Sequence, residues 1–265
     1  MKLCMMSCML GASMTPREIV QTAVECGMDA IDWVSTHKTD PAELRKMSLD
    51  AGLKIVSHTM LKTKFLKRES DYMDEFKESL EDACILGSPI LMLPPFPRYE
   101  QVSMEDDRKA WIEYYAQACP LAQKAGVTLT VESTGYPNSP IVTVEENLEV
   151  LKAVPGLMAT LDNGNMSTAG DFLEGYTRLK EYVVHFHLKD YKVFDTEQPL
   201  SSRRRTGKYY RDCVIGEGDL DLRSFWNTVD EKGRELYVNL ETLDPTKERT
   251  NAQVQKLVAE KLRHW

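Results

Sequence analysis

Six times along this chain, a short apolar run closely follows a glycine that stands at the end of a helix-like segment. Glycine just past the last turn of a helix can adopt the left-handed conformation that closes the helix, so each of these glycines predicts a junction between a helix and a strand. The six junctions are Gly27 before residues 28–34, Gly52 before 53–57, Gly87 before 89–93, Gly126 before 127–132, Gly156 before 157–162 and Gly233 before 236–241.

Helix starts follow an equally regular pattern. Thr15 and Asp40 are each followed at once by proline and three residues later by glutamate, and Thr143 is followed three residues later by glutamate. A capping side chain, proline at the first helical position and glutamate at the third are typical of helix N-termini. By the same reasoning, Asp244 and Pro245 predict the start of the last helix. Further strands near residues 2–7 and 183–188 bring the total to eight, alternating with helices.

Eight strand–helix units in 265 residues predict an α/β fold, a single (β/α)8 TIM barrel with eight parallel strands that forms one domain over residues 1–265. Alternation of strands and helices requires a parallel sheet, and barrels of this kind run to about 250 residues. No G-x-G-x-x-G loop follows any strand, which disfavours an open doubly wound sheet. The one long irregular segment, residues 191–218, is expected to be a strand-to-helix loop on the active face.

Composition narrows the classes of partner. The formal net charge of −8 disfavours nucleic acid, which proteins bind largely by neutralising its phosphates. The six cysteines show no paired spacing, so we interpret them as free thiols in a reducing compartment, with Cys26, Cys84 and Cys119 buried in helices. No apolar run approaches the roughly 20 residues of a membrane span. We therefore expect a cytoplasmic protein without a nucleic-acid or membrane partner.

Four strands in the second half of the chain end with a side chain that can bind a metal ion. In each strand apolar residues alternate with polar ones, and successive side chains of a strand point to opposite faces. The apolar set must face the helices, so the polar set faces the barrel axis and ends at the carboxyl end, where barrel active sites lie. The four side chains are Glu132, Asp162, His187 and Glu241.

Three carboxylates that converge in this way repel one another unless a cation lies among them. Three oxygen ligands and one imidazole suit Mn²⁺ or Mg²⁺, with Co²⁺ or Zn²⁺ as alternatives. A solvated loop start explains any one of the acidic residues as well as metal binding does, but it explains four consecutive inward-facing strand ends poorly. We therefore predict one divalent metal ion, with Mn²⁺ favoured, bound by all four residues.

The segments around these residues resemble the sugar phosphate isomerase/epimerase superfamily, the xylose-isomerase-like barrels. The matching segments are TVES with Glu132, LDNGN with Asp162, HFHLKD with His187, GEGDLD, and VNLET with Glu241. They follow the strand order over nearly the whole chain, and HxHLKD…GEG is the most specific part. The superfamily includes ketose 3-epimerases, hydroxypyruvate isomerase, inosose dehydratase and AP endonucleases.

The resemblance implies both ligands and chemistry. Members bind Mn²⁺, Mg²⁺, Co²⁺ or Zn²⁺ through the four matching residues, and in the resembled epimerases the glutamates that match Glu132 and Glu241 also form the acid/base pair, one on each face of the sugar. The expected enzyme is a metal-dependent isomerase or epimerase that removes a proton next to the carbonyl of a sugar or sugar-like keto compound, through a metal-stabilised enediolate. A dehydratase or lyase on an inosose or keto-sugar C-glycoside begins with the same enolisation and stays an alternative.

Two departures from the family pattern bear on function. Many members carry histidine where this chain has Asn165, so Asn165 is expected to bind a substrate hydroxyl but not to transfer a proton. AP endonucleases need extra histidines for three zinc ions, and this chain has five histidines and a net charge of −8, which disfavours a nuclease. The expected partner is a small sugar or polyol, and assembly into a homo-oligomer is left open.

Other polar residues near the strand ends have competing interpretations. His58 either lines the substrate cavity or caps a loop, and Lys189 either polarises a substrate oxygen or pairs with a carboxylate. His185 is interpreted as a core histidine rather than a ligand, and Asp32 as structural. Glu217, in the GEG turn, is expected to accept a hydrogen bond from His187.

Residues 201–211 hold five cations in a protein of net charge −8. Loops after the seventh and eighth strands often bind phosphate in such barrels, and arginine binds oxyanions through two parallel hydrogen bonds. We expect at least one arginine to fold over the metal site and contact substrate oxygens, with a solvated surface loop as the alternative. The candidates are Arg203, Arg204, Arg205 and Arg211.

Overall fold

The computed structural model describes residues 1–11, 14–98, 102–170 and 172–265. Its central strands are β1 (Lys2–Met6), β2 (Ala30–Val34), β3 (Lys54–Thr59), β4 (Ile90–Met92), β5 (Thr128–Glu132), β6 (Met158–Asp162), β7 (Val183–Leu188) and β11 (Tyr237–Leu240). They form a closed barrel in the spatial order β1-β11-β7-β6-β5-β4-β3-β2, and every neighbouring pair is parallel. This confirms the predicted (β/α)8 barrel.

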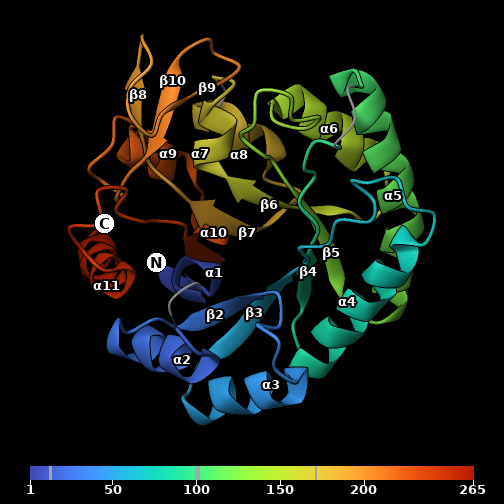
Figure 1. Ribbon diagram of the computed structural model, residues 1–265, viewed down its shortest axis with the longest axis horizontal. Coiled ribbons are helices and arrows are strands. Elements are labelled where there is room, and N and C mark those ends of the chain that lie inside the picture. The colour runs from blue at the N-terminus through green and yellow to red at the C-terminus, as the bar shows by residue number, and fades with distance from the viewer. Residues whose placement is uncertain (12–13, 99–101, 171) are drawn as a thin grey trace.

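Helices surround the barrel and cover the outer faces of its strands (Figure 1). They are α1 (Cys8–Gly11), α2 (Pro16–Glu25), α3 (Pro41–Asp50), α4 (Tyr72–Leu86), α5 (Met104–Lys124), α6 (Val144–Ala153), α7 (Asn163–Ser167), α8 (Phe172–Leu179), α9 (Leu222–Thr228), α10 (Glu231–Arg234) and α11 (Asn251–Leu262). Among these described helices, none combines the length and the hydropathy needed to cross a membrane.

The predicted helix starts are confirmed at three places. Thr15 and Thr143 each accept a hydrogen bond from the backbone N–H three residues on, and the carboxylates of Glu18 and Glu146 accept one from the backbone N–H of the cap, so both capping boxes are complete. Asp40 caps α3 differently: its carboxylate accepts from the N–H of Ala42.

The predicted start of the last helix is wrong. The carboxylate of Asp244 accepts hydrogen bonds from the Thr246 hydroxyl at 2.6 Å and from Arg249 Nε at 2.8 Å, so it closes a turn. The helix α11 begins only at Asn251, where Thr250 provides a complete capping box. The last predicted junction, from α10 to β11, is present, but Gly233 lies inside α10 and does not close it, whereas the other five glycines have φ between 66° and 88°.

The barrel interior changes character along its axis. Near the beginnings of the strands it is apolar, with Cys4, Ala30, Val56 and Ile90 in one cluster and Val184 packed against it. Val56 and Val184 are the extra residues at two register shifts, one between β2 and β3 and one between β6 and β7. By alternation Val184 belongs to the apolar set that is expected to face the helices, and for this residue the expectation is wrong, because a bulge places two consecutive side chains on one face.

Higher in the barrel the interior is polar. Thr130 and Thr160 share a hydrogen bond of 2.9 Å between β5 and β6, and Asn239 of β11 donates to Asp32 of β2 at 2.7 Å. These residues have the inward parity that the alternating pattern predicts. These hydrogen bonds tie together the strands of the barrel just below the strand ends.

All six cysteines are free thiols, as expected. Cys26 and Cys119 are buried, but Cys84 is exposed, contrary to the prediction. Cys84 lies in α4, whose buried side chains include Phe76, Leu80 and Ala83, so it occupies another face of that helix.

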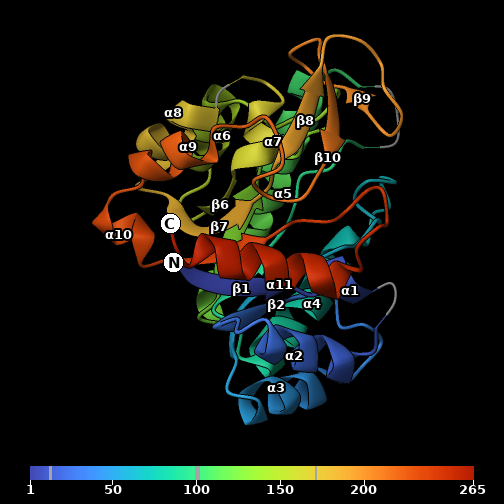
Figure 2. The ribbon, with the colours of Figure 1, turned by 90° about the vertical axis from the view of Figure 1, so that its left-hand side faces the viewer.

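The sequence predicts that the segment after β7 is irregular. In the structure this segment forms its own antiparallel sheet. Its strands are β8 (Tyr191–Phe194), β9 (Ser202–Arg203) and β10 (Tyr209–Asp212), with β10 in the middle. This sheet stands away from the barrel at the top of Figure 2. The segment belongs to the active face, as predicted, if its residues line the cavity at the carboxyl ends of the barrel strands.

Candidate metal centre and cavity

The structure brings the four predicted ligands together at the carboxyl ends of their strands. Glu132 ends β5, Asp162 ends β6, His187 is next to last in β7 and Glu241 directly follows β11. Each residue offers one ligand atom, and these atoms all lie within 4.8 Å of one another. The Nδ1 atom of His187 lies 2.6 Å from Glu132 Oε1 and 3.8 Å from Glu241 Oε2.

The LDNGN segment positions Asp162 by capping a short helix. Asp162 Oδ1 accepts from the backbone N–H of Asn165 at 2.6 Å, at the start of α7. The Asn163 side chain then exchanges two hydrogen bonds of 3.0 Å with the backbone of Lys189, so the ends of β6 and β7 are tied together. Gly164 leaves room for the Lys189 stem, because a Cβ atom there would lie 2.7 Å from the Cβ of Lys189.

The polar layer beneath the cluster fixes the His187 ring. Asn239 Nδ2 lies 2.9 Å from His187 Nε2 and 2.7 Å from Asp32 Oδ2, and Thr59 donates to Asp32. Because Asn239 contacts the Nε2 atom of His187 from below, the Nδ1 atom points at the carboxylates of the cluster. Burial raises the pKa of Asp32 to about 6. Asp32 and Asn239 therefore hold the ring from below.

Glu217 does not have the role that the sequence predicts. Its carboxylate pairs with Arg249, at 2.6 and 2.9 Å, and makes no contact with His187. The GEG turn instead wraps the carboxylate of Asp190, which accepts from the N–H groups of Gly216 and Gly218 at 2.8 and 2.9 Å. The family motif HLKD…GEG thus builds a closed loop beside the strand end.

Several features of the cluster fit a divalent cation. Glu132 Oε1 and His187 Nδ1 are buried and 2.6 Å apart, yet they do not have hydrogen-bond geometry, and neither atom has another hydrogen-bond partner among the described residues. Burying two such atoms face to face is costly unless a proton or a metal cation lies between them. The donor set, three carboxylates and one imidazole, is one that Mn²⁺, Mg²⁺, Co²⁺ and Zn²⁺ accept.

The charges of the cluster respond to burial and to each other. Burial raises the pKa of Asp162 well above its usual range, although Lys189 acts in the opposite direction. Burial alone would lower the pKa of His187, but the adjacent Glu132, together with Glu241 and Asp32, raises it to about 9. Ionising the buried carboxyl of Asp162 is therefore unfavourable unless a cation lies close to it, as expected of an acidic metal site.

The structure supports one of the two interpretations of Lys189, the pair with a carboxylate. Its Nζ atom lies 2.5 Å from Glu241 Oε1 and 3.9 Å from Asp162 Oδ2, so the ion pair with neighbouring carboxylates is confirmed. Burial would lower its pKa, but Glu241 and the other acidic neighbours raise it well above the usual range. Lys189 also lines the cavity, so a contact with substrate stays a prediction.

Asn165 joins the cluster to the cavity wall. Its amide donates to Asp162 Oδ2 at 3.1 Å and to the carbonyl of Ser133 at 2.9 Å, while its Oδ1 accepts from Tyr191 and Lys189 at 3.4 and 3.5 Å. It therefore lines the cavity beside the cluster, and a contact with substrate stays a prediction.

A cavity of about 330 Å³ opens over the cluster. Glu132, Glu241, Asn165 and Lys189 form its polar side. The opposite side is apolar and comes from the ends of the first four strands and the loops after them, with Met6, Val34, Leu61, Met92, Pro94 and Phe96. The insertion after β7 contributes Tyr191, Arg204 and Asp212, which places it on the active face as predicted.

The arginine that lines this cavity is Arg204. It donates to the carbonyl of Gly135 at 2.7 Å, and its guanidinium lies 5.8 Å from the centre of the Tyr136 ring. Its Nε is buried and has no hydrogen-bond partner among the described residues. Sequence position alone did not distinguish Arg204 from its neighbours.

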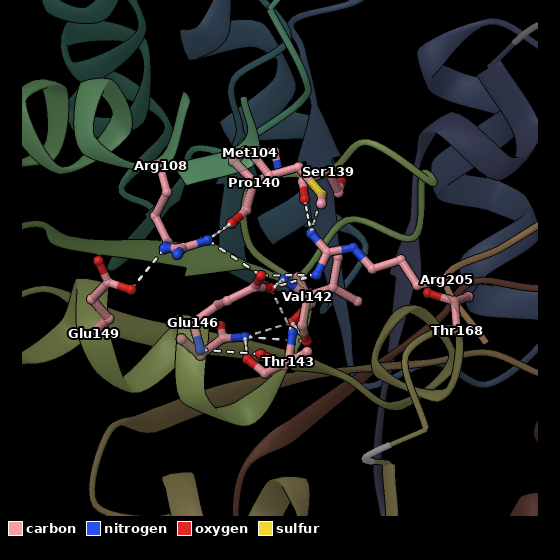
Figure 3. Close-up of polar contacts among 12 residues, drawn as sticks. Met104, Arg108, Ser139, Pro140, Val142, Thr143, Glu146, Glu149, Thr168 and Arg205 are labelled. Atoms are coloured by element: carbon pink, nitrogen blue, oxygen red, sulfur yellow. Dashed lines mark hydrogen bonds and ion pairs between the residues drawn. The ribbon is translucent and has the colours of Figure 1, made fainter. Parts of the chain in front are cut away.

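The structure places the other three candidate arginines away from the cavity. Arg205 pairs through Nη1 with Glu146 at 2.8 and 2.9 Å and through Nη2 with the carbonyl of Ser139, while Arg108 approaches Glu146 from the other side (Figure 3). Arg203 is exposed and contacts the carbonyl of Gly207, and Arg211 lies over the Phe194 ring. These contacts are structural, so the predicted substrate contact of these three arginines finds no support in their positions.

His58 is also not at the cluster. Because of the bulge at Val56, the side chain of His58 points to the face of β3 opposite that of Thr59, and Thr59 lines the cavity. The Nδ1 atom of His58 lies 2.7 Å from the carbonyl oxygen of Trp33. His58 lines a second cavity of about 810 Å³ with His37. Burial lowers the pKa of His58 to about 4, so it is neutral at physiological pH.

His185 is buried directly below His187, with ring centres 5.4 Å apart, and burial lowers its pKa well below the usual range. It is a core histidine, as the sequence indicates. The residues that the sequence did not single out are Tyr136, Tyr191 and Asp212. Tyr191 directly follows HFHLKD, so its place near the cavity was within reach of the motif; nothing local distinguishes the other two.

Comparison with known proteins gives a consistent result. The family model described as xylose isomerase-like TIM barrel matches residues 20–264. The inosose isomerase of Bacillus licheniformis is 21% identical over 182 residues, which make up 68% of this chain and 63% of that protein. The chain therefore matches less than two thirds of the length of this relative.

Two solved structures share the fold over nearly their full length. The IOLI protein with a binding zinc atom gives a TM-score of 0.78 at 17% identity, and the match covers 99% of this chain and 96% of that one. A D-psicose 3-epimerase in the presence of D-fructose also gives 0.78, at 16% identity, with 100% and 98% covered. At these identities the likeness shows a common fold.

Proposed function

The chain belongs to the xylose isomerase-like TIM barrel family, and from this premise we propose that it is a divalent-metal-dependent isomerase or epimerase of a sugar or sugar-like keto compound. The observation that carries the proposal is the convergence of Glu132, Asp162, His187 and Glu241 within 4.8 Å at the end of the barrel where active sites lie. The relatives that are named as an inosose isomerase and a D-psicose 3-epimerase support the substrate class.

We assign the metal to the four converging residues. Glu132, Asp162, His187 and Glu241 would hold it, and Mn²⁺ is our first choice for this donor set, with Mg²⁺, Co²⁺ and Zn²⁺ as alternatives. When bound, such an ion polarises a carbonyl oxygen and stabilises the negative charge that develops when the adjacent C–H proton leaves. The zinc atom of the IOLI protein, which has the same fold, supports a divalent ion here.

The proton transfer falls to the two glutamates that line the cavity. Glu132 reaches it from β5 and Glu241 from the end of β11. Burial would raise the pKa of Glu241, but Lys189 and His187 lower it below its usual value, so Glu241 is held as the carboxylate that accepts a proton. In the proposed reaction one glutamate removes a proton from the substrate carbon and the other returns one.

The remaining polar residues orient the substrate. Asn165, which cannot titrate, offers an amide beside Asp162, and Lys189 offers its ammonium group next to Glu241. Arg204 closes the cavity from the insertion.

The test is a panel of ketoses, inososes and keto-glycosides incubated with the Mn²⁺-loaded protein in deuterated water. We expect deuterium at a carbon next to the carbonyl together with a product of otherwise unchanged mass. A product lighter by one water, or one split from its substituent, would assign the dehydratase or lyase reaction instead. Absence of exchange with every substrate, or cleavage of abasic DNA, would contradict the proposal.

A further inference from the structure

An apolar recess adjoins the cavity over the cluster. Its volume is about 450 Å³, and Leu61, Leu66, Phe96, Pro97 and Tyr136 form its apolar lining, with Lys62 and Thr63 completing it. None of these described lining residues is acidic. The recess therefore differs sharply in chemistry from the cluster, where three carboxylates meet.

The recess and the cavity share part of their lining. Leu61, Phe96 and Tyr136 line both, so a molecule bound over the cluster touches the same side chains as a group placed in the recess. All three come from loops that follow the ends of barrel strands β3, β4 and β5. A ligand that spans both spaces has its polar part near Glu132 and Glu241 and its other part against apolar side chains.

Two of the shared residues expose large, mainly apolar side chains to solvent. Leu61 and Tyr136 each keep 48% of their surface accessible although both are large and mainly apolar. The Tyr136 ring is nevertheless held in place, because the Phe96 ring meets it edge-on with centres 6.0 Å apart and the Arg204 guanidinium lies 5.8 Å from its centre. A fixed, exposed ring next to a polar cavity is suited to packing against a flat ligand group.

We propose that the substrate is a conjugate: a hydroxylated, sugar-like head binds over the cluster, and an apolar, aromatic substituent on that head occupies the recess formed by Leu61, Leu66, Phe96, Pro97 and Tyr136. This inference rests on the proposed function for the head group and adds the substituent. A free sugar has no apolar part for this recess. An empty apolar cavity of about 150 Å³ is enough to bind benzene, so the recess has room for at least one ring.

The experiment compares two probes that differ only in the substituent. Phenyl β-D-glucopyranoside and methyl β-D-glucopyranoside are titrated into the Mn²⁺-loaded protein by calorimetry. We expect the phenyl glycoside to bind at least about tenfold more tightly, from burial of its ring. Equal affinities, or no measurable binding of the phenyl glycoside, would overturn the proposal.

Matched variants locate the effect. Leu61→Ser and Tyr136→Ser change exposed side chains of the recess, and each is expected to reduce the ratio of the two affinities by about threefold or more, with metal content unchanged. The control is Leu49→Ser, on α3 and 52% exposed, which should leave the ratio as in the wild type. A ratio unaffected by the recess variants would contradict the proposal. So would a dimer that dissociates in Leu61→Ser, since a second copy would then cover this face.

The outcome is separable from that of the proposed function. Proton exchange with a free keto-sugar but no preference for the phenyl glycoside would overturn the recess proposal alone. A clear preference that depends on Leu61 and Tyr136, without exchange on any substrate, would keep the recess as a binding site and overturn the reaction.

Discussion

At the carboxyl ends of β1, β2 and β4, the side chains that line the central cavity are Met6, Val34 and Met92, and Thr59 of β3 is the one polar member of this set. At the ends of β5, β6, β7 and β11 the corresponding side chains are those of the cluster, three carboxylates and an imidazole. One half of the rim is thus apolar and the other half charged, within one closed parallel sheet.

The difference shows how a symmetric architecture acquires one-sided chemistry. Every strand presents its last inward side chain to the same space, so a single residue per strand decides what that part of the rim does. The charged half holds the four residues that we propose for metal binding and proton transfer. The apolar half adjoins the recess at Leu61 and Phe96, so its side chains restrict which ligand shapes can bind.

The largest effect should come from removing a ligand in the charged half. Asp162→Ala and His187→Ala are each expected to lose most of the bound metal while the barrel stays folded, whereas Met92→Leu, in the apolar half, should keep it. Elemental analysis after gel filtration measures the metal, and circular dichroism checks the fold. Stoichiometric metal in both ligand variants would remove the distinction between the two halves.

A smaller effect should follow when the charge of one ligand is changed but its oxygen is kept. Glu241→Gln retains an oxygen ligand and loses a basic carboxylate, so we expect residual metal binding with C–H exchange reduced at least about a hundredfold. Glu217→Gln is the matched control, because Glu217 pairs with Arg249 on the surface. Exchange at the wild-type rate in Glu241→Gln would move the base to another residue, with Glu132 the next candidate.

The smallest effect concerns the insertion that closes the cavity. Arg204→Ala should raise the Michaelis constant about tenfold with unchanged metal content, since Arg204 is the arginine of residues 203–211 that lines the cavity. Arg203→Ala, the same change at an exposed neighbour, should behave as the wild type. Indistinguishable constants for the two variants would leave Arg204 with only its structural contacts to Gly135 and Tyr136.

The sequence predicted what depends on local spacing. Glycine after a helix, the capping boxes at Thr15 and Thr143, and the alternation that ends in Glu132 and Asp162 each involve residues a few positions apart, so the pattern contains its own geometry. The same alternation predicted that residues on four strands converge, because the carboxyl ends of parallel strands meet at one end of a barrel.

The errors arise where distant contacts decide. Asp244 has the spacing of a helix cap, but Arg249 and Thr246 take its carboxylate. The parity of His58 is changed by a bulge that alternation cannot foresee. The choice of Arg204 over Arg205 depends on the path of the insertion relative to Glu146, almost sixty residues earlier in the chain.

Glu146 makes the insertion and α6 a single cooperative unit. Its carboxylate accepts from the N–H groups of Val142 and Thr143, which begin the helix, and from Arg205 and Arg108. Lifting the insertion from the barrel would break the pair between Arg205 and Glu146, which adjoins the first turn of α6. In amide hydrogen exchange, protection at the start of α6 and in the strand pair β9–β10 should be lost together. This result would mean that the insertion uncovers the cavity by partial unfolding and not by a hinge motion.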